Sequence, residues 1–286
     1  MNLKKLFLFG LMFLSAMNVK SQTKTDELYK WMPSLVTGIG ISQVELENWA
    51  QGGENTFAYS FLVTFDLKYQ TDLWKFKNYL KVNYGQTKLG ESTFRTTENE
   101  IYLEDVISYN AGFVLDPFAS NIVRTSITRG FDYKSNPKTL IANFFDPGYI
   151  TQSIGFAYDK LPNIQTRLGI AFQETFTTAN ALARRYSDDP KTTNDLEKFK
   201  FETGMESVTD GKFSIDENVT LTSKLRLFTR FEDLSVWDVR WDNIINAKVN
   251  SWLNVNLGVI ILHEISQSYK TQLKEAIQIG ITYRLL

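Results

Sequence analysis

The sequence predicts an all-β protein: an up-and-down antiparallel β-barrel of about 12 strands that spans a membrane. Three observations predict this fold. Apolar and polar residues alternate along most of the chain, the connections alternate between short and long, and the composition suits strands. The chain of 286 residues contains 21 Phe and 13 Tyr but only 6 Pro. Aromatic residues are enriched in strands, whereas proline removes a backbone donor from a sheet.

The alternation is clearest between Phe57 and Tyr69. Every second residue there is aromatic or aliphatic, and the intervening residues include Asp66 and Lys68. Successive side chains of a strand point to opposite faces, so this pattern gathers the apolar side chains on one face, whereas a helix would scatter them. We expect twelve strands, in segments 33–44, 55–70, 73–87, 94–109, 119–132, 149–159, 163–177, 197–208, 212–230, 235–250, 251–264 and 271–286.

The connections between these segments alternate in length. Short ones are expected at 70–72, 160–162, 209–211 and 250–251, and longer ones at 45–54, 88–93, 133–148, 178–196 and 265–270. Two connections break the pattern, because 110–118 is long and 231–234 is short. Outer-membrane barrels have short periplasmic turns and longer external loops, and an even strand number returns both termini to the periplasm.

Three features predict that the apolar face contacts lipid and the polar face lines the lumen. The lumen of such a barrel is too wide for apolar side chains to fill. The opposite face of the strands is rich in charged and amide side chains. Aromatic residues near strand ends resemble interfacial girdles; these are Trp74, Tyr84, Tyr109, Tyr149, Trp237 and Tyr283.

The N-terminus resembles a secretory signal peptide. Lys4 and Lys5 precede an apolar stretch from Leu6 to Met17 that is shorter than the roughly 20 residues of a spanning helix. We expect Sec export, cleavage near Ser21, a short periplasmic segment over 22–32, and an outer-membrane barrel over 33–286. The partners expected from this location are outer-membrane lipid and lipopolysaccharide, the barrel-assembly machinery during biogenesis, and other envelope proteins.

Composition excludes several other classes of function. The chain has no cysteine, which excludes disulfides, thiolate metal sites and an N-terminal lipid anchor. The mature chain is expected to be slightly acidic, so nucleic acid is not an expected partner. No cofactor, metal ion or catalytic group is predicted.

The last strand carries a candidate assembly signal. Ile277, Ile279 and Ile281 alternate with polar or small residues, and four positions resemble the C-terminal signal read by the barrel-assembly machinery: Gln278, Gly280, Tyr283 and Leu285. The chain ends in Leu286, where many such proteins end in Phe. We also expect this strand to pair with the first, because an open sheet edge is not tolerated in lipid.

Inward-facing charges form a candidate lumen ladder. It comprises Lys75, Lys77 and Lys81 on one strand, Glu98, Glu100 and Glu104 on the next, and Arg226 with Asp238 in a later hairpin. Hairpin parity and loop length predict that Lys81 lies opposite Glu100, Lys77 opposite Glu104, and Tyr79 opposite Tyr102. The ladder is either a charged constriction that selects a polar solute or a salt-bridged lumen that is packed nearly shut. We favour the second interpretation.

Four other features have structural and functional interpretations. The Trp49–Gly53 segment is a tight loop or a ligand contact. His263, with Ser266 and Ser268 nearby, is an interfacial residue or part of a lipid hydrolase. The acidic residues of loop 178–196, with Glu197 after them, are solvated or bind Ca²⁺. The apolar segment Leu140–Phe145 could fold into the lumen as a plug. We favour the structural interpretation of the first three.

Several short motifs resemble a family of Bacteroidota outer-membrane barrels known only as a domain of unknown function. They are Asn48–Asn55, Trp74–Asn78 with Tyr84-Gly85, Arg95–Glu100, Asn143–Tyr149 and Gln272–Glu275. The resemblance implies a membrane barrel and supplies no activity. Two hypotheses follow: a non-enzymatic scaffold or accessory barrel of the envelope, which we favour, and a porin-like channel for small polar solutes.

Overall fold

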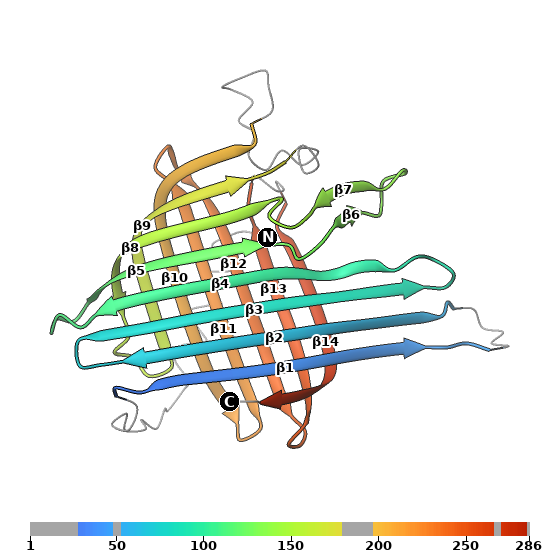
Figure 1. Ribbon diagram of the computed structural model, residues 1–286, viewed down its shortest axis with the longest axis horizontal. Helices are drawn as coiled ribbons and strands as arrows, with labels where there is room; N and C mark the ends of the chain where they lie inside the picture. The colour runs from blue at the N-terminus through green and yellow to red at the C-terminus, as the bar shows by residue number, and fades with distance from the viewer. Residues whose placement is uncertain (1–27, 48–52, 179–196, 266–269, 285–286) are drawn as a thin grey trace.

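The computed structural model describes residues 28–47, 53–178, 197–265 and 270–284. Twelve antiparallel strands close into a barrel in the order β1-β14-β13-β12-β11-β10-β9-β8-β5-β4-β3-β2 (Figure 1). The predicted fold class is therefore confirmed, including the pairing of the first strand with the last. The short strands β6 and β7 form a separate hairpin between β5 and β8. No helix within the described ranges is long and apolar enough to cross a membrane.

The barrel strands are β1 (Trp31–Val44), β2 (Thr56–Gln70), β3 (Trp74–Leu89), β4 (Arg95–Tyr109), β5 (Asp116–Thr125), β8 (Gly148–Tyr158), β9 (Ile164–Phe176), β10 (Phe199–Asp216), β11 (Val219–Arg230), β12 (Asp233–Lys248), β13 (Leu253–His263) and β14 (Gln272–Arg284). The outlying hairpin consists of β6 (Gly130–Asp132) and β7 (Thr139–Ala142). The predicted segment 119–132 is thus split into β5 and β6.

One predicted turn is wrong. Thr209-Asp210-Gly211 resembles a reversal, yet β10 continues through it, and the chain reverses at 217–218 instead. Thr209 is paired on both sides, with Thr166 of β9 and Leu225 of β11. Asp210 also lies 3.5 Å from the ammonium group of Lys224. Pairing with two neighbouring strands therefore outweighs the local turn preference of Asp-Gly.

The alternation of connection lengths is confirmed. Connections 71–73, 110–115, 159–163, 217–218 and 249–252 lie at the end of the barrel where β1 begins, which we call the turn end. Connections 45–55, 90–94, 126–147, 177–198, 231–232 and 264–271 join strands at the opposite end, the loop end. Both expected exceptions are present, because 110–115 is long for the turn end and 231–232 is short for the loop end.

The two faces of the barrel are inverted relative to a soluble protein. Large apolar side chains point outward and are exposed, such as Ile41 (64%), Ile154 (56%) and Ile277 (74%). Charged side chains point inward and are buried, such as Glu104 (0%) and Glu206 (3%). One predicted girdle residue is wrong: Tyr149 faces the lumen, 8% exposed, with the Arg124 guanidinium 4.6 Å from its ring centroid.

The seam between β1 and β14 is a close backbone contact. Gly40 pairs with Gly280, and a Cβ added at Gly280 would lie 2.5 Å from the carbonyl oxygen of Ile39. A Cβ atom at that position would force the neighbouring backbone to shift, so the glycine allows the first and last strands to close the barrel.

The segment Leu140–Phe145 does not plug the lumen. The adjoining loop lies on the outer side of β4, where the Asn99 side-chain oxygen accepts hydrogen bonds from the amides of Ile127 (2.9 Å) and Thr128 (3.0 Å). The Phe145 ring packs on Phe176, an outward residue of β9, at a centroid distance of 5.7 Å. Aromatic packing on the outer rim therefore accounts for the apolar character that suggested a plug.

Candidate functional site

Ion pairs that cross the lumen are the main polar feature of the interior. In a ring of twelve strands, two walls six positions apart are directly opposite. An eight-stranded barrel is just wide enough for its side chains to fill, so a wider one is bridged only by long side chains that meet end to end. Arg, Lys and Glu have the required length and complementary charge.

Glu104 lies at the centre of the network. Its carboxylate, fully buried on β4, accepts a hydrogen bond from Arg167 of β9 at 2.5 Å. It also accepts one from Lys224 of β11, which lies five strand positions from β4. Two cations from strands three and five positions away are thereby held against one anion. A charge buried this deeply is stable only when it is paired and hydrogen-bonded.

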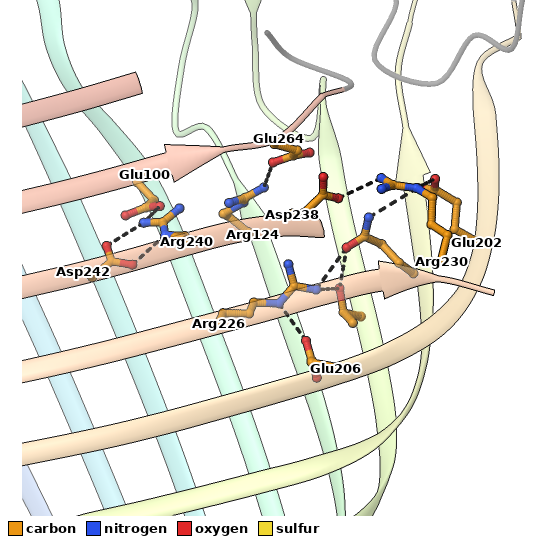
Figure 2. A network of polar contacts seen from close by, with 12 residues as sticks. Glu100, Arg124, Glu202, Glu206, Arg226, Arg230, Asp238, Arg240, Asp242 and Glu264 are labelled. Carbon is orange, nitrogen blue, oxygen red and sulfur yellow. Dashed lines mark hydrogen bonds and ion pairs between the residues drawn. The ribbon is translucent and has the colours of Figure 1, made fainter. Parts of the chain in front are cut away.

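A second bridge joins directly opposite walls. Arg240 of β12 contacts Glu100 of β4 at 2.8 Å, and these strands are six positions apart (Figure 2). The same guanidinium binds Asp242 at 2.7 and 3.0 Å, and Glu100 also pairs with Lys81 at 2.7 Å. The planar guanidinium fork allows Arg240 to hold two carboxylates at once.

A third layer lies nearer the loop end. Arg124 of β5 contacts Glu264, the residue that follows β13 on the opposite wall, at 3.4 Å (Figure 2). Arg230 bridges Asp238 at 2.8 Å and Glu202, while Arg226 binds Glu206 at 2.6 Å. The ion pairs therefore lie at several depths of the lumen rather than in one ring.

A separate cluster lies at the turn end. Lys75 binds Asp116 at 3.1 Å and Asp159 at 2.5 Å, and Lys160 approaches the same two carboxylates at 3.4 and 3.6 Å. Of these four residues, only Lys75 is predicted from the sequence as a lumen residue. Asp116, Asp159 and Lys160 stand at strand ends or in turns, where an acidic residue is ordinarily interpreted as a solvated turn residue.

The ladder residues all lie on strand faces that point inward, but their predicted partners are partly wrong. The β3–β4 register is shifted by two residues, so that Lys81 lies opposite Tyr102 and Tyr79 opposite Glu104. A β-bulge at Gly85 and Gln86 produces part of this shift. Lys81 still reaches Glu100 diagonally, as its ion pair shows.

The remaining ladder residues differ in their partners. Lys77 lies opposite Val106, and it forms no ion pair within the described ranges. Glu98 pairs with Lys274 of β14 at 2.6 Å. The predicted pair of Arg226 with Asp238 is wrong, because Arg226 lies opposite Arg240 and binds Glu206, while Arg230 takes Asp238.

The cations that complete the bridges are not among the residues predicted from the sequence. They are Arg124, Arg167, Lys224, Arg230, Arg240 and Lys274. The alternation of each strand already places them on inward faces. The partners of Arg230 lie on the adjacent strands β10 and β12, whereas those of the other five cations include carboxylates three to six strand positions away. No pattern within one hairpin encodes which distant strand a side chain meets.

The inward face near the seam has a different character. It is formed by small residues, which we call the small-residue wall: Gly38, Gly40, Ser42, Ala58, Ser60, Gly258, Ala276 and Gly280. A cavity of about 270 Å³ lies along β1, β2 and β14 at this wall, and Thr97 and Glu98 of β4 also line it. The Lys274–Glu98 pair crosses the lumen beside the cavity.

The candidate assembly signal lies at this seam. Gln278 donates to the Ser60 hydroxyl at 3.2 Å, Gly280 pairs with Gly40, and Tyr283 pairs with Thr37. Leu285 lies outside the described residues. The structure thus gives Gln278 and Gly280 a role in closing the barrel, and recognition by an assembly machinery stays a prediction.

The other candidates are placed only in part. The His263 ring nitrogen Nδ1 lies 3.2 Å from the Thr271 hydroxyl. Several candidates lie outside the described residues: the signal peptide, Trp49–Gly52, the acidic residues of loop 178–196 before Glu197, Ser266 and Ser268. Within the ranges described, no group of three or more His, Cys, Asp or Glu side chains is arranged to hold a metal ion.

Comparison with known proteins gives a family match of unknown function. A family described as "Protein of unknown function (DUF3078)" matches residues 41–131, less than half of the chain. The motifs at Asn48–Asn55, Trp74–Asn78 and Arg95–Glu100 lie inside that stretch. The match supports the resemblance to a domain of unknown function. No curated protein matches the chain.

Solved structures similar to the chain include three barrels at low identity. An outer membrane channel from Pseudomonas putida F1 has 7% identity and a TM-score of 0.39, covering 92% of this chain and 99% of that one. The translocator domain of the autotransporter NalP from Neisseria meningitidis has 10% identity and a TM-score of 0.36, covering 89% and 88%. OmpF from Salmonella typhi has 11% identity and a TM-score of 0.29, covering 92% and 99%.

Proposed function

We propose that the protein is a non-enzymatic barrel of the outer membrane whose lumen is closed, and that it serves as a scaffold or accessory subunit of the cell envelope. The observation that carries this proposal is the set of ion pairs between opposite walls, above all Arg240 with Glu100 and Lys224 with Glu104. Such pairs narrow the lumen and place side chains across the path that a solute would take along its axis.

The distribution of apolar and aromatic side chains supports the membrane location. Exposed aliphatic residues surround the barrel, and aromatic pairs stand at the turn end: Trp31 with Tyr69 at a centroid distance of 4.6 Å, and Trp74 with Tyr109 at 4.8 Å. Tyr and Trp prefer the boundary between hydrocarbon and water. The expected signal peptide would deliver the chain across the inner membrane.

The energetics of the network support a permanently closed state. Removing one partner of a buried ion pair costs about 3–5 kcal/mol, because the other charge is left buried and unpaired. Opening the lumen would separate Glu104 and Glu100 from cations on far walls at the same time. The pairs therefore oppose the opening of a path through the centre.

Efflux of small polar solutes from proteoliposomes tests this proposal. Vesicles with the wild-type protein should release a trapped monosaccharide no faster than protein-free vesicles. The Glu100→Ser/Arg240→Ser variant removes both halves of one bridge and should release the monosaccharide faster. It leaves one cation, Lys81, and one anion, Asp242, without these partners, so the net charge of the lumen is unchanged. Rapid release through the wild type would contradict the closed state, and copurified partners after mild detergent extraction would support the scaffold.

The cavity along the small-residue wall favours a second candidate function, a narrow porin-like channel. Under this hypothesis a polar solute follows the wall beside Ala276 and passes the Lys274–Glu98 pair. Wild-type vesicles would then leak, and Ala276→Leu would stop the leak by filling the cavity. The matched control is Ile277→Leu, which changes the adjacent residue on the exposed outer face.

A further inference from the structure

A row of polar side chains crosses the outer face of β3, β4, β5 and β8, which lie side by side in Figure 1. Its members are direct cross-strand partners in one continuous line: Asn78, Asp105, Asn121 and Gln152. We call this set the outer polar row. Apolar residues border it at both ends, Leu67 of β2 and Phe172 of β9.

The outer polar row lies inside the apolar band rather than at its edge. The next outward-facing row toward the turn end is Phe76, Ile107, Ala119 and Ile154. The next one toward the loop end is Leu80, Leu103, Val123 and Ile150. Ile107 and Ile154 are 43% and 56% exposed, which shows that this face points away from the lumen. A polar row between two apolar rows would be surrounded by hydrocarbon.

The hydrogen bonds of this row are incomplete within one chain. Asn78 donates to the Asp105 carboxylate at 2.6 Å. Within the part of the chain that the structure describes, Asn121 and Gln152 make no side-chain hydrogen bond. A polar group in lipid without a partner is costly, and a charged one more so.

Another outward polar pair shows the contrast. On the far wall, the Ser223 hydroxyl lies 2.8 Å from the Asn243 side-chain oxygen and accepts a hydrogen bond from the Trp241 indole at 2.9 Å. Those groups are satisfied within the chain and need no partner. The outer polar row therefore differs from the other wall in its unmet hydrogen-bonding capacity, not merely in being polar.

We propose that the outer polar row is the contact through which two copies of this chain associate side by side in the membrane. A two-fold axis along the membrane normal makes the contact isologous, so that Asp105 of each copy meets Asn121 of the other. The row is self-complementary because it combines one carboxylate acceptor with amides that donate. Ala119, the next outward-facing residue toward the turn end, is small and permits close approach beside Asn121.

This inference rests on the proposed membrane location and does not require a closed lumen. Because barrels are cylindrical, the contact spans few strands, and the central residues Asp105 and Asn121 provide most of it. Gln152 and Asn78 lie at the edges of the contact.

Cysteine cross-linking of the full chain in phospholipid vesicles tests the proposal. The chain has no cysteine, so Ala119→Cys adds a single thiol beside the row without changing the row itself. A short bis-maleimide should produce a covalent dimer. Val259→Cys is the matched control, because Val259 faces outward on β13, six strand positions from β5, and should give only collisional background.

A second variant shows whether the polar side chains of the outer polar row hold the two copies together. Asn121→Leu in the Ala119→Cys background should lower the cross-linked fraction by about tenfold or more, because the carboxylate of the partner loses its donor. The barrel should remain folded, since leucine suits a lipid-facing position, and its sheet content is checked by circular dichroism.

The outcomes distinguish the dimer from the membrane location. Equal cross-linking at positions 119 and 259, or a protein that enters the membrane and stays monomeric, would overturn the proposed dimer and leave the membrane location intact. Cross-linking in intact outer membranes to a different protein would overturn the second copy as occupant. A protein that fails to enter vesicles at all would instead overturn the membrane location.

Discussion

Two parts of the lumen wall differ in how they occupy space. Along β3, β4, β11 and β12, which form the charged part, many inward side chains are long and charged, and some meet partners from distant strands, as Arg240 meets Glu100. Along β13, β14, β1 and β2 the small-residue wall places glycine, serine and alanine inward, and a cavity of about 270 Å³ lies beside it. Side-chain length, rather than strand number alone, therefore decides where a twelve-stranded barrel is filled.

The two parts also differ in what stabilises them. In the charged part, stability depends on pairing each buried charge. When one partner is removed, the remaining charge stays buried, without an ion pair and without water to solvate it. At the seam, stability depends on backbone approach, because Gly280 leaves no room for a Cβ atom beside Ile39. We therefore expect the removal of a charge to destabilise the charged part, and an added methyl group to destabilise the seam.

The largest effect is expected at Glu104. Glu104→Gln should lower the free energy of unfolding by about 3–5 kcal/mol, because Arg167 and Lys224 remain buried without their shared carboxylate. Urea titration of the protein in lipid vesicles measures this change. An unchanged unfolding midpoint would show that the central bridge contributes nothing.

A smaller effect is expected at the seam. Gly280→Ala should lower the free energy of unfolding by about 1–3 kcal/mol, because its Cβ would lie 2.5 Å from a backbone oxygen. Gly258→Ala is the matched control on the neighbouring strand, where the nearest atom would be 3.9 Å from the added Cβ. Equal effects of the two substitutions would refute the close-approach explanation.

The smallest effect is expected at the pair beside the cavity. Lys274 is 44% exposed, so its ion pair with Glu98 is partly screened by water. Lys274→Met should change the free energy of unfolding by no more than about 1 kcal/mol, as exposed ion pairs do. A loss as large as that of Glu104→Gln would remove the distinction between the two parts of the lumen.

The sequence predicts the strands and the direction of their faces, but it does not predict which side chains meet across the lumen. Alternation placed the strands and the inward faces of Lys75, Lys81 and Glu104 correctly, because a two-residue period is a local property of the backbone. It did not identify the partners of Arg167 or Arg240, because these depend on barrel closure.

Local turn signals were less reliable than alternation. Thr209-Asp210-Gly211 has the composition of a turn, yet β9 and β11 hold it as a strand. The β3–β4 register was wrong by two residues because a bulge at Gly85 and Gln86 leaves little trace in the sequence. The small-residue wall was not predicted, because glycine and serine are uncharged and form no charge pattern along the strands.

Planar-bilayer recording of the purified wild-type barrel tests the closed lumen most directly. We predict no current steps for the wild type. The Glu100→Ser/Arg240→Ser variant should give discrete, sustained current steps under the same voltage and salt. Sustained steps from the wild type, with no increase in the variant, would contradict the closed lumen.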